Sequence, residues 1–415
     1  MPPMAQPYLR IAMIVGKFPV LSETFIVNQV RGLRARGHEV DIYALYGGPD
    51  GTERTLCEQG GQNGIKAIYP PRPTGKLLPD IGLMLAQSAQ DPGQAGPLWR
   101  LAGEYDKLGR REIFMRGSAF FRRQPYDVVY CQFGSVALDI LPLRSMPALS
   151  GKLVVAFRGA DVSSYVRGSD CDVYTELFRD IDVALPNSEF FRQRLIDLGC
   201  EADCCRVIRS GIRVQDFPYR PRAVPGDGIV RFIFVGRLVA KKGLDDCLKA
   251  FRLVRQSRDN FRLTIVGHGP LRREIDELID ILQLKKHVRT IGALPHNEVR
   301  SILDEHHVFI SANKTPPSGD QEGITNTLKE AAATGLPLIS TRHGGIPELV
   351  EDGENGYLVD EGDIERLAAR IIQVMDHPEQ WPALGAKGRK RVVGGFDQEA
   401  WNEKLADELM QVVGM

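Results

Sequence analysis

Short apolar runs alternate with stretches of helical spacing along the chain. The run 9–16 ends in Gly16 and precedes a helical pattern over 22–36, which ends at Gly37. Apolar runs of this length between loops are typical of buried parallel strands. The alternation therefore predicts an α/β fold with helices on both faces of a parallel sheet. Further strands in the first half are predicted at 40–45, 128–131, 153–157 and 183–186.

Residues 214–228 separate two such alternating regions, because they contain three prolines and two glycines between apolar strands. A chain of 415 residues is also too long for one typical core. We therefore predict two doubly wound domains that face each other across a cleft, with the carboxyl ends of the strands lining it. Strands of the second half are predicted at 230–235, 261–266, 288–291, 308–311 and 337–340, and helices at 244–256, 271–282, 298–304, 327–334 and 363–375.

Two glutamates of the second half, Glu322 and Glu330, stand eight positions apart. The polar turn 323–326 between them precedes a helix, where backbone amides and the helix dipole favour an anion. If the intervening stretch is mostly helical, its rise separates the two carboxylates by about 12 Å. That span suits a nucleotide-sugar, with one acid on the sugar hydroxyls and the other on the ribose. The alternative is a helix with two solvated glutamates.

Four other loops follow predicted strands of the second half. In the first of them, Arg237 and Lys242 lie five apart just before a helix, and an anionic ligand would favour cations at that position. The alternative is a solvated basic turn. Because the strands end at one edge of a parallel sheet, all five loops are expected to converge. The remaining three loops are Gly267-His268-Gly269-Pro270, Gly292-Ala293-Leu294-Pro295 and Gly344-Gly345-Ile346-Pro347-Glu348.

Composition narrows the class of protein. The 53 basic and 53 acidic side chains balance, so no net charge would attract nucleic acid. Seven cysteines form no C-x-x-C pair, and their odd number speaks against a complete disulfide framework. No leader pattern precedes Leu9, and no apolar run approaches the length of about 18 residues that spans a membrane. We expect a reduced, cytoplasmic enzyme.

These motifs together resemble the family-4 retaining glycosyltransferases of GT-B fold, and the resemblance covers nearly the whole chain. The segment 17–25 is similar to the bacterial subgroup that builds colanic acid and related exopolysaccharides. The resemblance implies that the first domain binds the acceptor and the second a UDP- or GDP-sugar donor, without a further cofactor. No Asp-x-Asp stands at a strand end in a usable setting, so a metal on the diphosphate is not expected, and cationic side chains would take its role. The resemblance also implies three structural units, at 1–218, 219–392 and 393–415, with the last helix crossing back onto the first domain.

The resemblance assigns roles to individual residues. Arg237 and Lys242 would hold the diphosphate, Glu330 the ribose hydroxyls and Glu322 the hydroxyls of the donor sugar. The expected catalytic residues are Arg158, Asp161, Arg237, Lys242 and Glu322. The expected donor-binding residues are Gly16, Gly236, Arg237, Lys242, Gly267, Gly269, Leu294, Glu322, Gly323, Ile324, Thr325, Asn326, Thr327 and Glu330.

Two positions depart from the family pattern. Thr325 stands where members often have proline, which leaves an extra backbone donor near the sugar. Arg158 stands where many members have a histidine, and a guanidinium cannot act as a base at neutral pH. The leaving phosphate itself would then accept the proton of the acceptor, while cations stabilise the separated charge. Asp161 would orient Arg158 or the acceptor hydroxyl; its alternative role is a helix cap.

Residues 107–123 form a basic segment, since Glu112 is their single acid. Apolar side chains, among them Phe114 and Phe120, are interleaved with the arginines. The pattern fits a surface that contacts anionic lipid or a lipid diphosphate acceptor, and equally an amphipathic core helix with one solvated face.

We therefore expect a metal-independent, retaining enzyme that moves a hexose to a growing, lipid-linked glycan, cytoplasmic or peripheral on the inner face of the membrane. Three alternatives remain open: transfer to a small soluble acceptor, a nucleotide-sugar epimerase, and a non-catalytic nucleotide-sugar binder.

Overall fold

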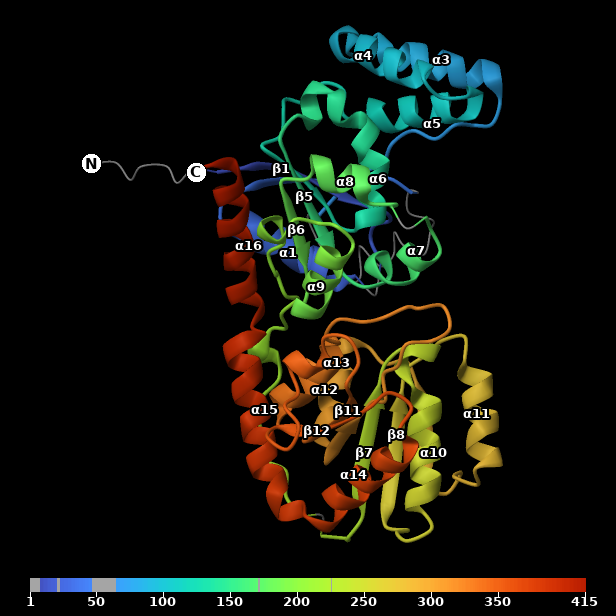
Figure 1. Ribbon diagram of the computed structural model, residues 1–415, viewed down its shortest axis with the longest axis vertical. Helices are drawn as coiled ribbons and strands as arrows, with labels where there is room; N and C mark the ends of the chain where they lie inside the picture. Colours follow the sequence, from blue (N-terminus) through green and yellow to red (C-terminus); the bar gives the residue numbers. More distant parts are fainter. Residues whose placement is uncertain (1–7, 21–22, 47–64, 171, 225) are drawn as a thin grey trace, which may run out of the picture.

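The computed structural model describes residues 8–20, 23–46, 65–170, 172–224 and 226–415, which form two stacked α/β domains (Figure 1). Each domain is built on a parallel sheet of six strands, in the orders β3-β2-β1-β4-β5-β6 and β12-β11-β10-β7-β8-β9. The first sheet consists of β1 Arg10–Val15, β2 Glu39–Ala44, β3 Ala67–Ile68, β4 Val128–Cys131, β5 Lys152–Phe157 and β6 Val183–Pro186. The second consists of β7 Val230–Val235, β8 Phe261–Val266, β9 Val288–Gly292, β10 Val308–Ile310, β11 Leu338–Thr341 and β12 Gly356–Val359.

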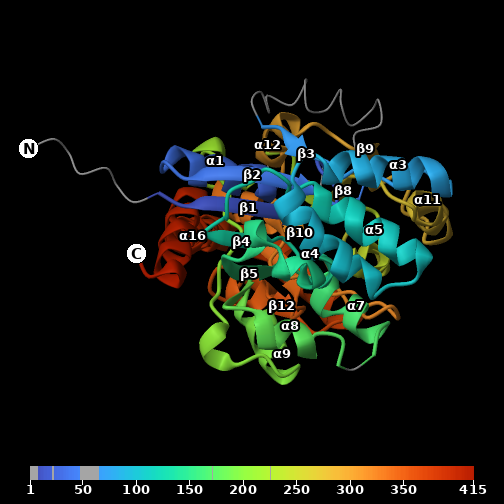
Figure 2. The same cartoon turned by 90° about the horizontal axis from the view of Figure 1, so that it is seen from above.

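Helices pack on both faces of each sheet, and Figure 2 shows the same domains from above. This arrangement confirms the predicted doubly wound fold. The first domain contains α1 Thr24–Ala35, α3 Leu77–Ser88, α4 Pro92–Gly103, α5 Lys107–Ser118, α6 Gly134–Ile140, α7 Ser164–Arg167, α8 Thr175–Asp180 and α9 Glu189–Asp197. The second contains α10 Leu244–Val254, α11 Arg272–Ile281, α12 His296–Asp304, α13 Asn326–Thr334, α14 Ile364–Asp376 and α15 Trp381–Gly395; the last helix is α16 Gln398–Val413.

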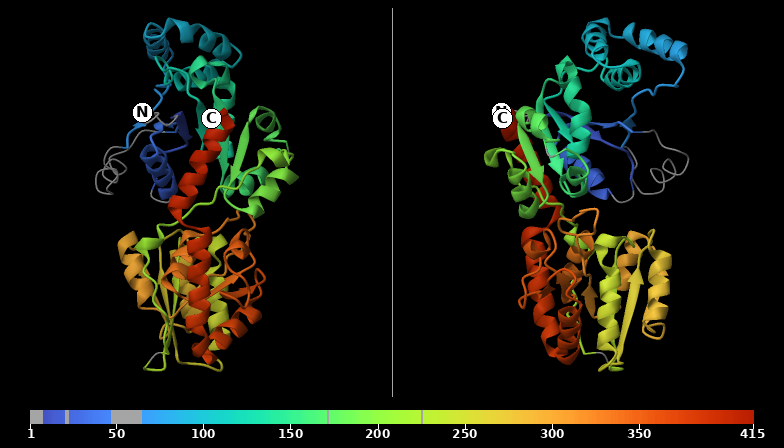
Figure 3. Two further views of the ribbon diagram at one scale, coloured as in Figure 1. Left: turned by 90° about the vertical axis from the view of Figure 1, so that its left-hand side faces the viewer. Right: turned by 45° about the vertical axis from the view of Figure 1, so that its right-hand side comes forward.

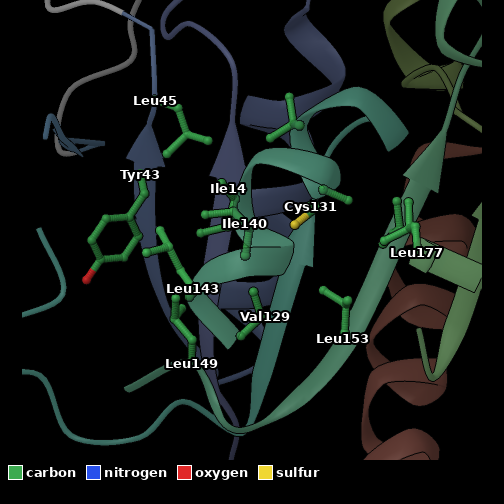
Figure 4. Close-up of a cluster of buried hydrophobic side chains, with 14 of the residues drawn as sticks. Ile14, Tyr43, Leu45, Val129, Cys131, Ile140, Leu143, Leu149, Leu153 and Leu177 are labelled. Carbon is green, nitrogen blue, oxygen red and sulfur yellow. The ribbon is translucent and has the colours of Figure 1, made fainter. Parts of the chain in front are cut away.

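The first sheet is apolar on both faces because successive side chains of a strand point to opposite sides. On β1, Ile14 packs with Val129 and Cys131 of β4 in the layer that α6 covers (Figure 4). Met13 packs in the opposite layer, which also contains residues of α1 and α16. Continuous apolar runs, rather than alternation, are therefore the pattern that this sheet requires.

The chain crosses between the domains twice, and the two crossings lie side by side. The Ile212 N–H donates to the Phe396 carbonyl and the Gln398 N–H donates to the Ile212 carbonyl, both over 2.9 Å. Helix α16 then packs along the first domain, where Leu405 and Leu409 join its core (Figure 3). The unit limits at 218 and 392 stay predictions, but Phe396, expected on the crossing helix, packs in the second domain instead.

The basic segment 107–123 contributes a helix to the core of the first domain. Phe114 and Phe120 are fully buried, and Ile113 and Phe121 nearly so. Two of the arginines are paired: Arg111 with Asp80 over 2.9 Å and Arg116 with Asp139 over 2.7 Å. The amphipathic core helix is thus the better interpretation of the pattern. None of the helices described is both long and apolar enough to span a bilayer.

Candidate functional site

The loop after β7 brings two lysines to the carboxyl edge of the second sheet. It tightens at Gly243, which has a φ of 60° and lies so close to β10 that a Cβ would meet the Ala312 carbonyl oxygen at 1.6 Å. Glycine is therefore required there. Lys242 and Lys241 precede this turn, whereas the Arg237 guanidinium is exposed and makes no hydrogen bond or ion pair within the described part of the chain.

Glu322 lies between the two lysines. Its Oε2 accepts from Lys242 Nζ over 2.5 Å and its Oε1 is 3.4 Å from Lys241 Nζ. Asn313 Nδ2 donates a further hydrogen bond over 3.2 Å. Burial alone would raise the pKa of Glu322, but the lysine charges prevail and lower it to about 2. Glu322 is consequently ionised across the physiological pH range, and a diphosphate would compete with it for Lys242.

His343 fixes the main chain at Glu322, a role that the sequence did not reveal. The Glu322 N–H donates to His343 Nε2 over 3.1 Å, and His343 Nδ1 lies 2.6 Å from Glu361 Oε1. These partners assign a neutral imidazole with its proton on Nδ1. Glu361 also accepts from the Thr315 N–H over 2.7 Å. The loop that bears Glu322 is thus tied to the segment after β12.

Helix α13 begins at Asn326, four residues after Glu322, and its N-cap Thr325 makes no side-chain capping hydrogen bond. The backbone N–H groups of the first turn, those of Asn326 and Thr327 among them, therefore have no intrahelical partner and favour an anion. Because the residues from Glu322 to Thr325 are not helical, the expected spacing of about 12 Å between the two glutamates, which assumed a mostly helical stretch, does not apply.

Glu330 is buried on α13, with only 5% of its surface exposed. Burial raises the pKa of Glu330, and the charges of His296 and Lys329 partly offset that effect. His296 Nδ1 lies 4.0 Å from Glu330 Oε1, at the end of the loop that contains the half-buried Leu294. The alternative of two solvated glutamates is therefore wrong, because both carboxylates are largely buried and have different neighbours.

Arg158 is held inside the first domain. Its Nη2 donates to Gln132 Oε1 over 2.9 Å and to Gln29 Oε1 over 3.2 Å, and its Nη1 to Ser210 Oγ over 3.2 Å. The guanidinium carbon also lies 4.1 Å from the centre of the Phe25 ring. Burial lowers the pKa of Arg158. The four neighbours hold its guanidinium next to Ser210, two residues before the crossing at Ile212.

Asp161 has no hydrogen bond to the Arg158 guanidinium. Instead its carboxylate accepts backbone N–H groups: those of Arg158 and Gly159 over 3.0 and 2.9 Å, and that of Gly134 at the start of α6 over 3.2 Å. Its oxygens are therefore engaged in shaping the loop after β5. Asp161 can therefore orient Arg158 only through the main chain, and its expected catalytic role stays a prediction.

Close packing explains most of the glycines that were expected to bind the donor. A Cβ on Gly267 would meet the Gly236 carbonyl oxygen at 1.8 Å, and one on Gly269 would meet that of Leu238 at 2.4 Å. These residues allow the loops after β7 and β8 to touch. Gly16 lies in the first domain, where its Cβ would meet the Tyr46 ring at 3.2 Å.

The loop before α13 also contacts the first domain. Its Gln321 N–H donates to Ser163 Oγ over 3.1 Å, and a Cβ on Gly323 would meet Asn187 Oδ1 at 2.6 Å. On α13, the buried Lys329 donates to the Ser210 carbonyl over 2.5 Å. Burial lowers the pKa of Lys329 to about 7. First-domain residues and the segment of Glu322 thus meet at the carboxyl edge of the second sheet.

Comparison with known proteins identifies the family. The family model described as "Glycosyl transferases group 1" matches residues 222–391. The chain is 33% identical to WcaL of Salmonella typhimurium, a glycosyltransferase assigned to colanic acid biosynthesis, over 97% of this chain and 100% of that one. The chain belongs to the group 1 glycosyltransferases. It is also 30% identical to the amylovoran biosynthesis glycosyltransferase AmsK of Erwinia amylovora, over 97% of this chain and 99% of AmsK.

Solved glycosyltransferase structures confirm the expected GT-B architecture. Anabaena HepE in complex with UDP-glucose superposes with a TM-score of 0.70 over 97% of this chain and 100% of that one, at 17% identity. TarM superposes with a TM-score of 0.71 over the whole of both chains, at 12% identity. At this identity the likeness concerns the fold alone.

Replacing Arg237 by alanine tests the loop after β7, where this guanidinium has no partner among the described residues. We expect affinity for a nucleoside diphosphate to fall about ten- to a hundredfold, as for loss of a charge-assisted hydrogen bond, with the melting temperature unchanged. Calorimetric titration with UDP and GDP measures the effect. Arg273→Ala, on α11 and 88% exposed, is the matched control. Wild-type affinity in Arg237→Ala would contradict the phosphate assignment.

Proposed function

We propose that this glycosyltransferase is a retaining, metal-independent enzyme that transfers a hexose from a UDP- or GDP-sugar to a growing, lipid-linked glycan of an exopolysaccharide. The observation that carries the proposal is the enclosed Glu322 with Lys241 and Lys242, next to the uncapped start of α13. Such a cluster presents donors for a diphosphate and one permanent negative charge for the sugar.

The names of relatives support the donor and the product class. HepE was solved with UDP-glucose, and a mycobacterial relative, 25% identical over 82% of this chain, is named as a GDP-mannose-dependent mannosyltransferase acting on a phosphatidylinositol monomannoside. WcaL and AmsK are named for polysaccharide biosynthesis. These names support the proposal that this chain uses a nucleotide-sugar donor and a lipid-linked acceptor.

The reaction would break the bond between the sugar C1 and the diphosphate and form one between C1 and the acceptor oxygen on the same face. The acceptor proton would pass to the departing phosphate oxygen. His38 is unsuited as a base, because it is 5% exposed and its Nδ1 accepts the Leu9 N–H over 3.2 Å. Arg237, Lys241 and Lys242 would stabilise the diphosphate as it leaves, while the Glu322 carboxylate faces the positive charge that develops on the sugar.

Two measurements test this proposal. Membranes of a strain with a truncated exopolysaccharide supply the acceptor, and transfer of label from UDP- and GDP-hexoses into the lipid extract reports activity. NMR of the product then gives the anomeric configuration of the new bond. We expect the donor's α-configuration to be kept. Inversion would overturn the retaining assignment.

Chelation tests the absence of a metal requirement. We expect the transfer rate to be unchanged in excess EDTA, because cationic side chains rather than a divalent ion would neutralise the leaving group. The control is a parallel assay with added Mg²⁺ or Mn²⁺. Loss of activity in EDTA with recovery on metal addition would contradict the expectation, without affecting the assignment of Glu322.

A further inference from the structure

Helix α3 carries an apolar stripe that no part of the described chain covers. Leu77, Leu78, Ile81 and Leu85 are 56%, 81%, 38% and 58% exposed. At about 100° per residue these four positions fall within an arc of about 100°, so they share one face of the helix. Single exposed apolar residues are ordinary on a protein surface, but a contiguous stripe marks an interaction site.

The stripe faces outward because the adjoining face of α3, which carries Asp80 and Met84, is attached to the first domain. Asp80 is fully buried; its Oδ1 accepts from the N–H and the hydroxyl of Thr74, each over 2.7 Å, and its Oδ2 accepts from Arg111. Met84, 1% exposed, packs in the core of the first domain. Helix α3 is therefore held rigidly with its apolar side outward, rather than lying loose on the surface.

The exposed charges in the sequence that contains the stripe have one sign. Between residues 65 and 90 the single acid is Asp80, and its charge is paired with Arg111. Lys66, Arg72 and Lys76 in the same stretch are all exposed. An apolar helical face bordered by basic side chains is complementary to a bilayer with anionic headgroups, where the apolar residues enter the acyl boundary and the cations meet the lipid phosphates.

We propose that α3 is a membrane-docking helix, which lies in the surface of an anionic bilayer and holds the first domain against it. The expected membrane segment, 107–123, thereby changes role: its helix α5 is the support that anchors α3 through Arg111. Helices α3, α4 and α5 form a layer at the end of the first domain remote from the second (Figures 1 and 3). Docking through this layer leaves the donor domain clear of the lipid.

Vesicle binding tests the docking helix directly. The full chain is sedimented with vesicles of phosphatidylcholine alone or mixed with phosphatidylglycerol. We expect binding to the mixed vesicles, and a loss of at least about tenfold in partitioning for the triple variant Leu78→Ser, Ile81→Ser, Leu85→Ser, because insertion free energy scales with buried apolar area. Ile281→Ser on α11, 75% exposed, is the matched control and should bind like the wild type.

A second variant tests the charges. Arg72→Gln with Lys76→Gln should weaken binding to mixed vesicles by about fivefold per residue and leave any binding to phosphatidylcholine unchanged. Wild-type chain that does not bind anionic vesicles, or a serine triple variant that binds equally well, would overturn the proposal. So would light scattering that shows a dimer of the wild type and a monomer of the triple variant, since the stripe would then be an interface between copies. None of these readouts depends on the transferase reaction.

Discussion

Replacing Glu322 by glutamine is expected to lower the turnover number about ten- to a hundredfold without lowering affinity for the nucleoside diphosphate. The loss corresponds to a charge-assisted hydrogen bond in a closed site, about 1.5–3 kcal/mol. Nucleotide binding should persist or tighten, because the substitution releases Lys242, which is 2.5 Å from Glu322 Oε2. Single-turnover kinetics with a UDP- or GDP-hexose and calorimetry with the free nucleotide separate the two effects.

The other glutamate of the site should behave differently. Glu330→Gln is expected to weaken free nucleotide and nucleotide-sugar alike, since a ribose is common to both ligands. Its folding should be unimpaired, because burial disfavours the charged form of Glu330. Glu354→Gln, which alters an exposed ion pair with Lys387, is the control and should change neither quantity. Equal losses of nucleotide affinity in Glu322→Gln and Glu330→Gln would reject this division of roles.

Ending the chain at Gly395 is expected to abolish soluble protein. The truncation removes α16, whose Leu405 and Leu409 are fully buried against the first domain. It would uncover the apolar side of α1, including Val30, and the exposed patch should cause aggregation. Yield in the soluble fraction and light scattering measure the result.

Milder substitutions on α16 keep this prediction testable if the truncated chain never accumulates. Leu405→Ala and Leu409→Ala should each cost about 2–5 kcal/mol of unfolding free energy, measured by denaturation. Asp407→Ala, on the exposed side of the same helix, should cost less than about 0.5 kcal/mol. Recovery of a soluble, fully active chain ending at Gly395 would mean that α16 is not part of the first domain's core.

Short apolar runs predicted most strands of this fold well. The strands expected at 128–131, 183–186, 230–235 and 261–266 are confirmed to the residue. Such runs succeed because a parallel strand covered on both faces must be apolar throughout. Strand β3, with two residues, was missed because a segment so short contains no pattern to recognise. Strand β12 was also missed, although it is as long as β4 and β6.

Only those features of the candidate site that follow from the order of the strands could be predicted from the sequence. Convergence of the Lys242 and Glu322 loops follows from strand order, and the structure brings these two residues into contact. The role of His343 was not predictable, because its two partners, the Glu322 N–H and Glu361, are far apart in sequence and show no pattern. The basic segment 107–123 misled for a related reason: composition does not tell which side of an amphipathic helix the rest of the chain will cover.

The position of α16 has a consequence for the order in which the protein forms during synthesis. The first domain begins at the amino end of the chain, but one of its core layers is supplied by the final helix. Every strand of the second sheet and the helix α15 that packs on α13 precede α16 in the chain. Until α16 has been synthesised, the layer of the first domain that contains Ile26, Val30 and Leu33 lacks one of its packing partners. The domain whose synthesis begins first therefore cannot complete its core before every strand of the second sheet has been made.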